Sequence, residues 1–256
     1  MAYFAVLVRG KNKIMTFDNI RIILVATTHP GNIGSAARAM KTMGLQRLYL
    51  VSPKSFPDYR AHEMSAGAYD VLDNAVVTDS LFEALRGCQL VFATSARPRD
   101  IALPGLTPAD CATSIADTQG KTDIAIVFGR EHAGLTNDEL LLCHYHVNIP
   151  SNPTFSSLNL AQAVQIIAYE LRMKIMSPKI DVHMHEEKRA SIDEVEQFYT
   201  HLQAVLVAID FLKLSNPKKL MHRLRRMFNR IQLEQLDINI LRGILSNIQR
   251  MLMNKD

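Results

Sequence analysis

The chain has 256 residues, enough for one large domain or for one mid-sized and one small domain. Hydrophobic residues make up 48%, no apolar run approaches the length of a membrane span, and three widely spaced cysteines do not suit a disulfide framework. These features exclude membrane and disulfide-rich classes and predict a cytoplasmic protein with reduced thiols. The apolar start at residues 1–8 precedes basic residues, which is the wrong order for a secretory signal.

The net charge is +4, and it is distributed unevenly. Lys and Arg outnumber Asp and Glu by six over residues 214–256, whereas acidic residues are in excess by three over residues 18–172. A basic C-terminal part predicts an anionic partner, and nucleic acid is the first candidate.

Strand and helix patterns alternate from Ile20 to about Met173, which predicts an α/β domain. Short apolar runs suit strands that are buried on both faces, as in a parallel sheet, and they occupy residues 22–25, 48–51, 90–92 and 124–128. Predicted helices cover about 33–43, ending at Gly44, and about 158–173; two more follow Asp79 and the capping box of Thr136 with Glu139.

The pattern in the rest of the chain predicts a linker and a small helical module. Residues 177–190 are polar, and a capping box of Ser191 with Glu194 then opens a helix that we expect to reach about Leu212. Asn216-Pro217 predicts a second helix start, with Asn as N-cap, and a third helix covers about 237–253. We therefore predict four segments: an N-terminal extension (1–17), a catalytic domain (18–173), a linker (174–190) and a helical domain (191–256).

Three sequence blocks carry the functional signal. They are N-I-G-S-A-A-R-A-M-K-T-M-G (32–44), I-V-F-G-R-E-H-A-G-L-T (126–136) and I-P-S-N-P-T-F-S-S-L-N-L-A-Q-A-V (149–164). The first is neither a dinucleotide fingerprint nor a P-loop, which counts against a nicotinamide-dependent dehydrogenase. In order and wording the blocks resemble the motifs of the SPOUT methyltransferases, in the RNA 2′-O-ribose branch and most closely the TrmJ family, over residues 18–172. That family begins near Asp18, so Met15 is a second candidate for the natural start.

The resemblance implies a parallel sheet with a deep trefoil knot and S-adenosylmethionine as cofactor. It implies 2′-O-methylation of tRNA at cytidine or uridine 32 in the anticodon loop, by a homodimer in which the arginine of one subunit serves the pocket of the other. Three loops would hold the cofactor, through Thr94, Ser95, Ala96, Gly129, Ile149, Ser156, Ser157 and Leu158. Small residues there let backbone groups approach an adenine and a ribose closely.

The candidate catalytic residues are Arg38, Asn32, Glu131, Ser157 and Asn159. A guanidinium has no lone pair to accept a proton, so we assign Arg38 to orientation and charge stabilisation. Each candidate also has a structural interpretation. Arg38 can be an ordinary surface arginine, Asn32 or Ser157 a helix cap, and Glu131 the partner of Arg130 in a salt bridge.

In the tail, Lys219, Arg223, Arg226 and Arg230 are spaced 4, 3 and 4 and share one helix face. This basic stripe predicts contact with RNA phosphates, with recognition mainly of backbone and shape, and no DNA partner is expected. A solvated surface is the alternative. The cluster Cys143-His144-Tyr145-His146 is too small for a structural zinc site, so we expect no metal.

Two alternative functions stay open at this point. The target can be rRNA or another tRNA position, or the chain can be an inactive RNA-binding relative of the methyltransferases. The long helix after Leu158 bears apolar residues at 160, 161, 164, 167, 168 and 171. They exceed what one buried face needs, which predicts a second partner for this helix.

Overall fold

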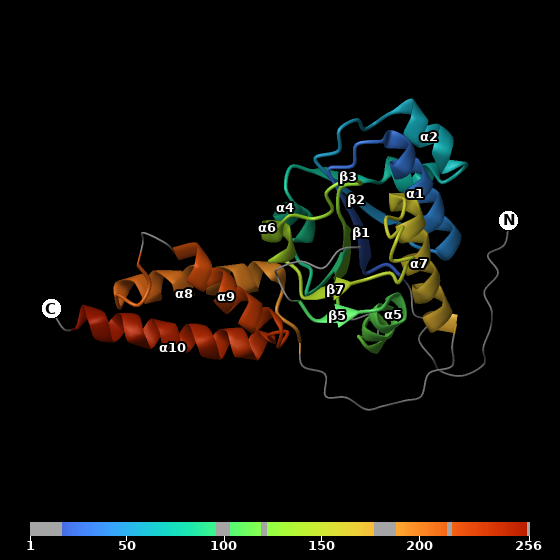
Figure 1. Cartoon of the computed structure of the whole chain (residues 1–256). Helices are drawn as coiled ribbons and strands as arrows, with labels where there is room; N and C mark the ends of the chain where they lie inside the picture. Colours follow the sequence, from blue (N-terminus) through green and yellow to red (C-terminus); the bar gives the residue numbers. More distant parts are fainter. Residues whose placement is uncertain (1–16, 96–102, 119–121, 177–187, 214–216, 255–256) are drawn as a thin grey trace.

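A computed structural model of the chain describes residues 17–95, 103–118, 122–176, 188–213 and 217–254 (Figure 1). The candidate start at Met15, the proposed cofactor residue Ala96, the expected N-cap Asn216 and most of the predicted linker lie outside these residues. The predicted segment boundaries near them therefore stay predictions.

A seven-stranded parallel sheet forms the centre of the catalytic domain, in the order β3-β2-β1-β6-β4-β7-β5. Its strands are β1 (Ile20–Val25), β2 (Arg47–Val51), β3 (Val76–Thr78), β4 (Leu90–Thr94), β5 (Gly105–Leu106), β6 (Ile124–Phe128) and β7 (Tyr145–Val147). The four predicted apolar runs are β1, β2, β4 and β6, and they lie next to one another in the middle of the sheet. Because both faces of the sheet are covered there, β4 and β6 are apolar at almost every position and β1 is so apart from Arg21, whereas β2 alternates half-buried and buried residues up to Leu50.

Alternate residues of these strands face two different helix layers. Ile22, Leu24 and Phe92 pack toward helices that include α1 (Pro30–Met43), α5 (Pro108–Asp117) and α7 (Leu160–Met176). Ile23 and Val91 face the opposite layer, with α4 (Leu81–Leu85) and α6 (Asn137–Leu140). Two short helices, α2 (Tyr59–Ser65) and α3 (Tyr69–Asp73), follow β2. The result is a three-layer α/β/α domain, as the alternation predicts (Figure 1).

Helix α1 ends as expected, since Gly44 adopts φ +91° and its amide bonds back to the last turn of the helix. Its start differs from one interpretation of the sequence, because His29 is the N-cap and Asn32 lies inside the helix. The close approach of α2 explains Gly34 in the same helix. A Cβ atom at this position would stand 2.0 Å from the carbonyl oxygen of Ala61.

Helix α7 overturns the argument that its apolar residues need a second chain. The six predicted positions are all buried within one chain, because α7 lies between α1 and α5 and is covered from two sides: Leu160, Ala161, Val164, Ile167, Ala168 and Leu171. The helix also starts at Leu160 rather than Leu158, and Asn159 caps it by accepting a hydrogen bond from the Ala161 amide (2.9 Å).

The C-terminal module contains α8 (Ile192–Ala208), α9 (Pro217–Asn229) and α10 (Gln235–Met253), packed side by side around a separate apolar core (Figure 1). The predicted capping box of Ser191 with Glu194 is present. Helix α8 ends four residues before the predicted Leu212, so Ile209 falls beyond it and is 42% exposed. None of the helices in the described ranges is long and apolar enough to cross a membrane.

The module is attached to the catalytic domain at the α4–β4 turn. The Ile192 amide donates to the Cys88 carbonyl (2.7 Å), and the Asp193 carboxylate accepts from the Gly87 amide (2.9 Å) and pairs with Arg86. The thiols of Cys88, Cys111 and Cys143 are free and buried. Burial raises the pKa of the Cys88 thiol to about 11, which disfavours the reactive thiolate.

His144 lies in the same region and is fully enclosed just before β7. Its Nδ1 accepts a hydrogen bond from the Val91 amide (3.0 Å), and burial together with the nearby Arg189 lowers its pKa from 6.5 to about 4. The neutral imidazole is therefore the form that the fold requires.

We expect this histidine to make folding sensitive to mild acid. As pH falls below 6.5 the unfolded chain binds a proton that the folded chain excludes, so stability falls with pH until the folded pKa near 4. The loss from His144 is about 2 kcal/mol between about pH 7.5 and about pH 5. Denaturant titrations should show this slope in the wild type. His144→Asn, which keeps an acceptor and does not titrate, should flatten it, and an unchanged slope would contradict the assignment.

Candidate active site

Glu131 joins the loops at the carboxyl ends of β1 and β6. Its carboxylate accepts hydrogen bonds from the Thr28 amide (3.1 Å), the Thr28 hydroxyl (3.0 Å) and the His29 amide (3.3 Å). The Asn32 side chain donates to the same carboxylate (3.0 Å), and Asn159 donates to Asn32 (3.0 Å). Three predicted site residues, one from each sequence block, thus form a single chain of hydrogen bonds.

The position of this carboxylate is electrostatically favourable. It lies at the N-terminus of α1, where free amides and the helix dipole attract negative charge. Partial burial alone would raise the pKa of Glu131. Hydrogen bonds from Asn32 and from nearby amides outweigh that effect, so the pKa lies below its usual value. Glu131 is therefore ionised at neutral pH and holds α1 against the β6 loop.

The salt bridge between Glu131 and Arg130 is absent. Arg130 instead makes a bidentate pair with Glu139 (2.9 and 3.0 Å), the residue that also closes the capping box of α6. The two charged residues that follow Gly129, Arg130 and Glu131, thus both have structural partners, and the carboxylates of Glu131 and Glu139 together fix the loop.

A cavity opens beside Glu131 at the carboxyl edge of the sheet. All the predicted cofactor residues that the structure describes line it: Thr94, Ser95, Gly129, Ile149, Ser156, Ser157 and Leu158. We call it the central cavity. The side chains of Phe128, Val147, Leu160 and Ala163 add an apolar wall. An apolar wall facing hydroxyl and backbone groups suits a ligand with an aromatic base and a polar chain, as the implied cofactor has.

Sequence reasoning missed the turn that forms one rim of this cavity. Arg130 and Gly134 exchange backbone hydrogen bonds (3.2 and 2.9 Å), which folds His132 and Ala133 over the opening. A Cβ atom on Gly129 would stand 2.2 Å from the backbone of Gly134. The two glycines of the motif, five residues apart, were the available signal for this tight turn.

Arg38 does not line the central cavity. It is exposed on α1 in a second hollow, which it shares with residues from the starts of α1 and α7 and from α2, among them Asn32, Asn159, Arg60 and Met64. We call this hollow the α1 groove. Asn32 and Asn159 lie in the groove and are linked through Glu131 to the cavity, so the predicted catalytic set is divided between two adjacent hollows.

The predicted basic stripe lies on and just beyond α9. Lys219, Arg223 and Arg230 are exposed and Arg226 is half-buried. Within the described ranges these four cations have no carboxylate partner, whereas Arg225 between them is paired with Glu196. The stripe is therefore a set of unneutralised charges on one side of the module.

Comparison with known proteins agrees with this arrangement. Residues 19–169 match the family model described as the SpoU rRNA Methylase family, and residues 193–256 match the model of the tRNA methyltransferase TrmJ C-terminal domain. The chain therefore belongs to the SpoU methylase family. Its relatives along almost the whole length include TrmJ proteins about 50% identical to it, which places it in the TrmJ branch of that family.

The relatives cover nearly all of the chain. A tRNA (cytidine/uridine-2′-O-)-methyltransferase TrmJ from Pectobacterium atrosepticum is 51% identical over 235 residues, covering 91% of this chain and 98% of the relative. The corresponding Salmonella typhimurium protein is 50% identical over 236 residues, with coverage of 91% and 97%. The crystal structure of TrmJ from Z. mobilis ZM4 superposes with a TM-score of 0.79 at 34% identity, covering 90% of this chain and 98% of that one.

The Gly129 turn generates a direct test of the central cavity. Gly129→Ala forces a methyl group against the Gly134 backbone, so we expect the rim to shift and cofactor affinity to fall by about tenfold or more, and stability by about 1–3 kcal/mol. Gly243→Ala on α10 is the matched control, since no atom lies within 4 Å of its added Cβ. Calorimetry with S-adenosylmethionine measures the difference, and equal affinity in both variants would rule out the cavity as the cofactor site.

Proposed function

We propose that this chain transfers a methyl group from S-adenosylmethionine to the ribose 2′-hydroxyl of cytidine or uridine in tRNA, at position 32 of the anticodon loop. The full-length similarity to proteins named tRNA (cytidine/uridine-2′-O-)-methyltransferase TrmJ supports the methyl transfer to cytidine or uridine in tRNA, and the motif resemblance supplies position 32. The central cavity supports it, because the residues expected to hold the cofactor meet there although they come from three separate loops.

The bound cofactor supplies an electrophilic methyl group. The protein's contribution is mainly to hold the ribose oxygen in line with that methyl, because correct orientation alone removes much of a barrier. Gly129, Ile149 and Leu158 enclose the cofactor, while Ser157 and Asn159 lie where the two hollows meet and contact the ribose.

Arg38 is assigned to the substrate oxygen. A guanidinium donates several hydrogen bonds in a fixed plane, so it orients a neighbouring phosphate and stabilises negative charge that develops as the hydroxyl loses its proton. Asn32 and Glu131 hold the helix that carries Arg38, and Glu131 acts through this positioning rather than by taking the proton.

The division of the site between two hollows favours a homodimer. Arg38 lies in the α1 groove and outside the central cavity of its own chain, so a partner whose cavity faces this groove would complete the site. Exposed Met64 in the groove offers apolar surface for such a contact. The buried face of α7 no longer supports this proposal, which rests on the placement of Arg38.

The stripe on α9 is proposed to hold tRNA by its phosphates. Four cations that have no carboxylate partner among the described residues, Lys219, Arg223, Arg226 and Arg230, are suited to bind RNA phosphates. We further propose a cytoplasmic location and a knotted chain path through β6, β7 and α7. The alternative target is rRNA, because the matching family model is described as the SpoU rRNA Methylase family.

Two sets of variants should separate catalysis from binding. Arg38→Ala should nearly retain tRNA affinity and lose turnover. The triple change of Arg223, Arg226 and Arg230 to Ala should weaken tRNA binding and reduce its salt slope by about 0.7–0.9 per lost phosphate contact. Filter binding across a salt series and single-turnover methylation measure the two effects.

The control for the triple variant is the pair Arg242→Ala and Arg250→Ala, which removes charge from α10 of the same module. If the control weakens binding as much as the triple variant, general charge and not the stripe is responsible. If the triple variant binds tRNA like the wild type, the stripe is only a solvated surface.

The homodimer has its own test. Met64→Arg places a charge in the α1 groove and should convert the protein to a monomer with normal cofactor affinity and no methyl transfer. Met251→Arg, at an exposed position of α10, should remain dimeric and active. Sedimentation at about micromolar concentration distinguishes monomer from dimer in the two variants. Met64→Arg should dissociate the dimer because an unpaired charge is costly to bury in an interface. A fully active monomer would refute the dimer.

A further inference from the structure

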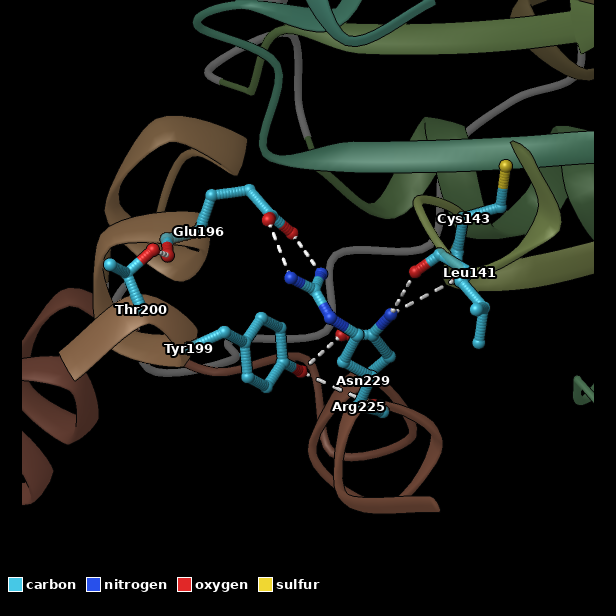
Figure 2. A network of polar contacts seen from close by, with 7 residues as sticks. All are labelled: Leu141, Cys143, Glu196, Tyr199, Thr200, Arg225 and Asn229. Carbon is cyan, nitrogen blue, oxygen red and sulfur yellow. Dashed lines mark hydrogen bonds and ion pairs between the residues drawn. The ribbon is translucent and has the colours of Figure 1, made fainter. Parts of the chain in front are cut away.

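A second attachment of the helical module lies at the end of α9, where Asn229 enters the catalytic domain. Its side chain is only 7% exposed, and its amide nitrogen donates to the carbonyl oxygens of Leu141 (3.0 Å) and Cys143 (3.5 Å). Figure 2 shows this side chain reaching from α9 to the segment that leads into β7. Asn229 is thus a polar bridge between the two parts of the chain.

The other end of Asn229 is held within the module. The Tyr199 hydroxyl donates to its carbonyl oxygen (2.6 Å), and burial raises the pKa of Tyr199, so the phenol keeps its proton. Arg225 stacks on the Tyr199 ring at 4.4 Å and makes a bidentate pair with Glu196 (Figure 2). Every hydrogen-bonding group of the Asn229 amide therefore has a partner, and its orientation is fixed from both sides.

The path from this bridge to the central cavity is short. Cys143 lies two residues before β7, and the last residue of that strand, Val147, lines the cavity. In the other direction, Asn229 is followed at once by Arg230 of the basic stripe and lies one helical turn from Arg226. One side chain therefore joins the stripe to the strand that borders the cavity.

We propose that Asn229 is a positioning residue that fixes the α9 stripe relative to the central cavity and thereby determines which ribose of a bound tRNA reaches the methyl group. This inference rests on the proposed function. Phosphate contacts determine where an RNA lies without reading its sequence. A stripe held at a fixed distance from the central cavity therefore selects the nucleotide that reaches the cavity. If the attachment at Asn229 were weakened, the stripe would still contact the RNA phosphates, but the bound RNA would occupy several registers relative to the cavity.

The hydrogen bonds of Asn229 contribute more to the orientation of the module than to the net stability of the protein. A buried amide with satisfied partners contributes little net free energy, but a buried group whose partner is removed is costly. The contact therefore gives a defined orientation, because other orientations of the module would leave the Leu141 and Cys143 carbonyls or the Asn229 amide unpaired.

Asn229→Asp tests the bridge with almost no change of shape. It keeps the oxygen that accepts from Tyr199 and turns the other contact into a carboxylate facing two carbonyl oxygens. Tyr199→Phe is the matched control, since it removes the hydrogen bond to Asn229 from the module side and leaves the two bonds that cross to Leu141 and Cys143. Both variants should bind S-adenosylmethionine normally and tRNA within about threefold of the wild type.

Activity and target choice should then diverge. We expect single-turnover methylation by Asn229→Asp to fall by about tenfold or more, because misplaced reactants lose most of the benefit of proximity, with methyl groups also found at neighbouring nucleotides. Tyr199→Phe should modify one nucleotide at near wild-type rate. Wild-type rate and a single target in Asn229→Asp would overturn the proposal, and so would equal losses in both variants, which would indicate only packing within the module.

The distance between α2 and α10 tests the fixed orientation of the module independently of methyl transfer. Spin labels can be attached at Tyr59→Cys in α2 and Ile240→Cys in α10, because both sites are exposed and the native thiols are buried. In dimers formed by mixing labelled chains with a large excess of unlabelled wild-type chains, each labelled dimer reports the distance within one chain. The wild type and Tyr199→Phe backgrounds should then give one narrow distance, and Asn229→Asp a broad one. A narrow distance in Asn229→Asp refutes the fixed attachment at Asn229 even if no RNA is methylated, whereas a wild type that methylates no tRNA refutes the function alone.

Discussion

The hydrogen bonds around the Glu131 carboxylate are the constraint on which the site depends. One ionised side chain satisfies amides at the start of α1 and orients Asn32, which in turn orients Asn159 at the start of α7. Because a partly buried charge without such partners would be costly, these hydrogen bonds favour this mutual arrangement of the three loops. The cavity and the groove are the two spaces that this arrangement leaves open.

The architecture separates the tasks of the enzyme by distance and by chemistry. The carboxyl edge of the parallel sheet supplies backbone groups and small side chains, which suit a cofactor held by close approach. The helical module supplies unpaired cations, which suit a long anionic partner. Directed polar contacts at Asp193 and Asn229 join the two parts, and Ile192 packs into the apolar cluster beside α4 and β4.

The sequence predicted the central strands of the sheet better than the edge strands and the contacts between distant segments. The strands β1, β4 and β6 could be predicted because burial on both faces makes them almost continuously apolar, and β2 because Leu48, Leu50 and Val51 are apolar. In contrast, β3 and β5 are short edge strands with little pattern. Motif resemblance brought together the cavity residues, which periodicity could not do. The pairing of Arg130 with Glu139, the packing of both sides of α7 and the bridge at Asn229 depend on contacts between distant segments, and no local pattern encodes them.

The separation of the paired residues along the chain bears on how the protein matures. Thr28 and Glu131 are 103 positions apart, and Asn32 and Asn159 are 127 apart. During synthesis the Thr28 and His29 amides therefore lack their Glu131 acceptor until the second half of the domain has left the ribosome. Such non-local closure slows folding, because the entropy of a long loop must be lost before the contacts compensate. Nascent chains consequently cannot present a formed pocket, and the capacity to bind a ligand there arises only once synthesis of the domain is nearly complete.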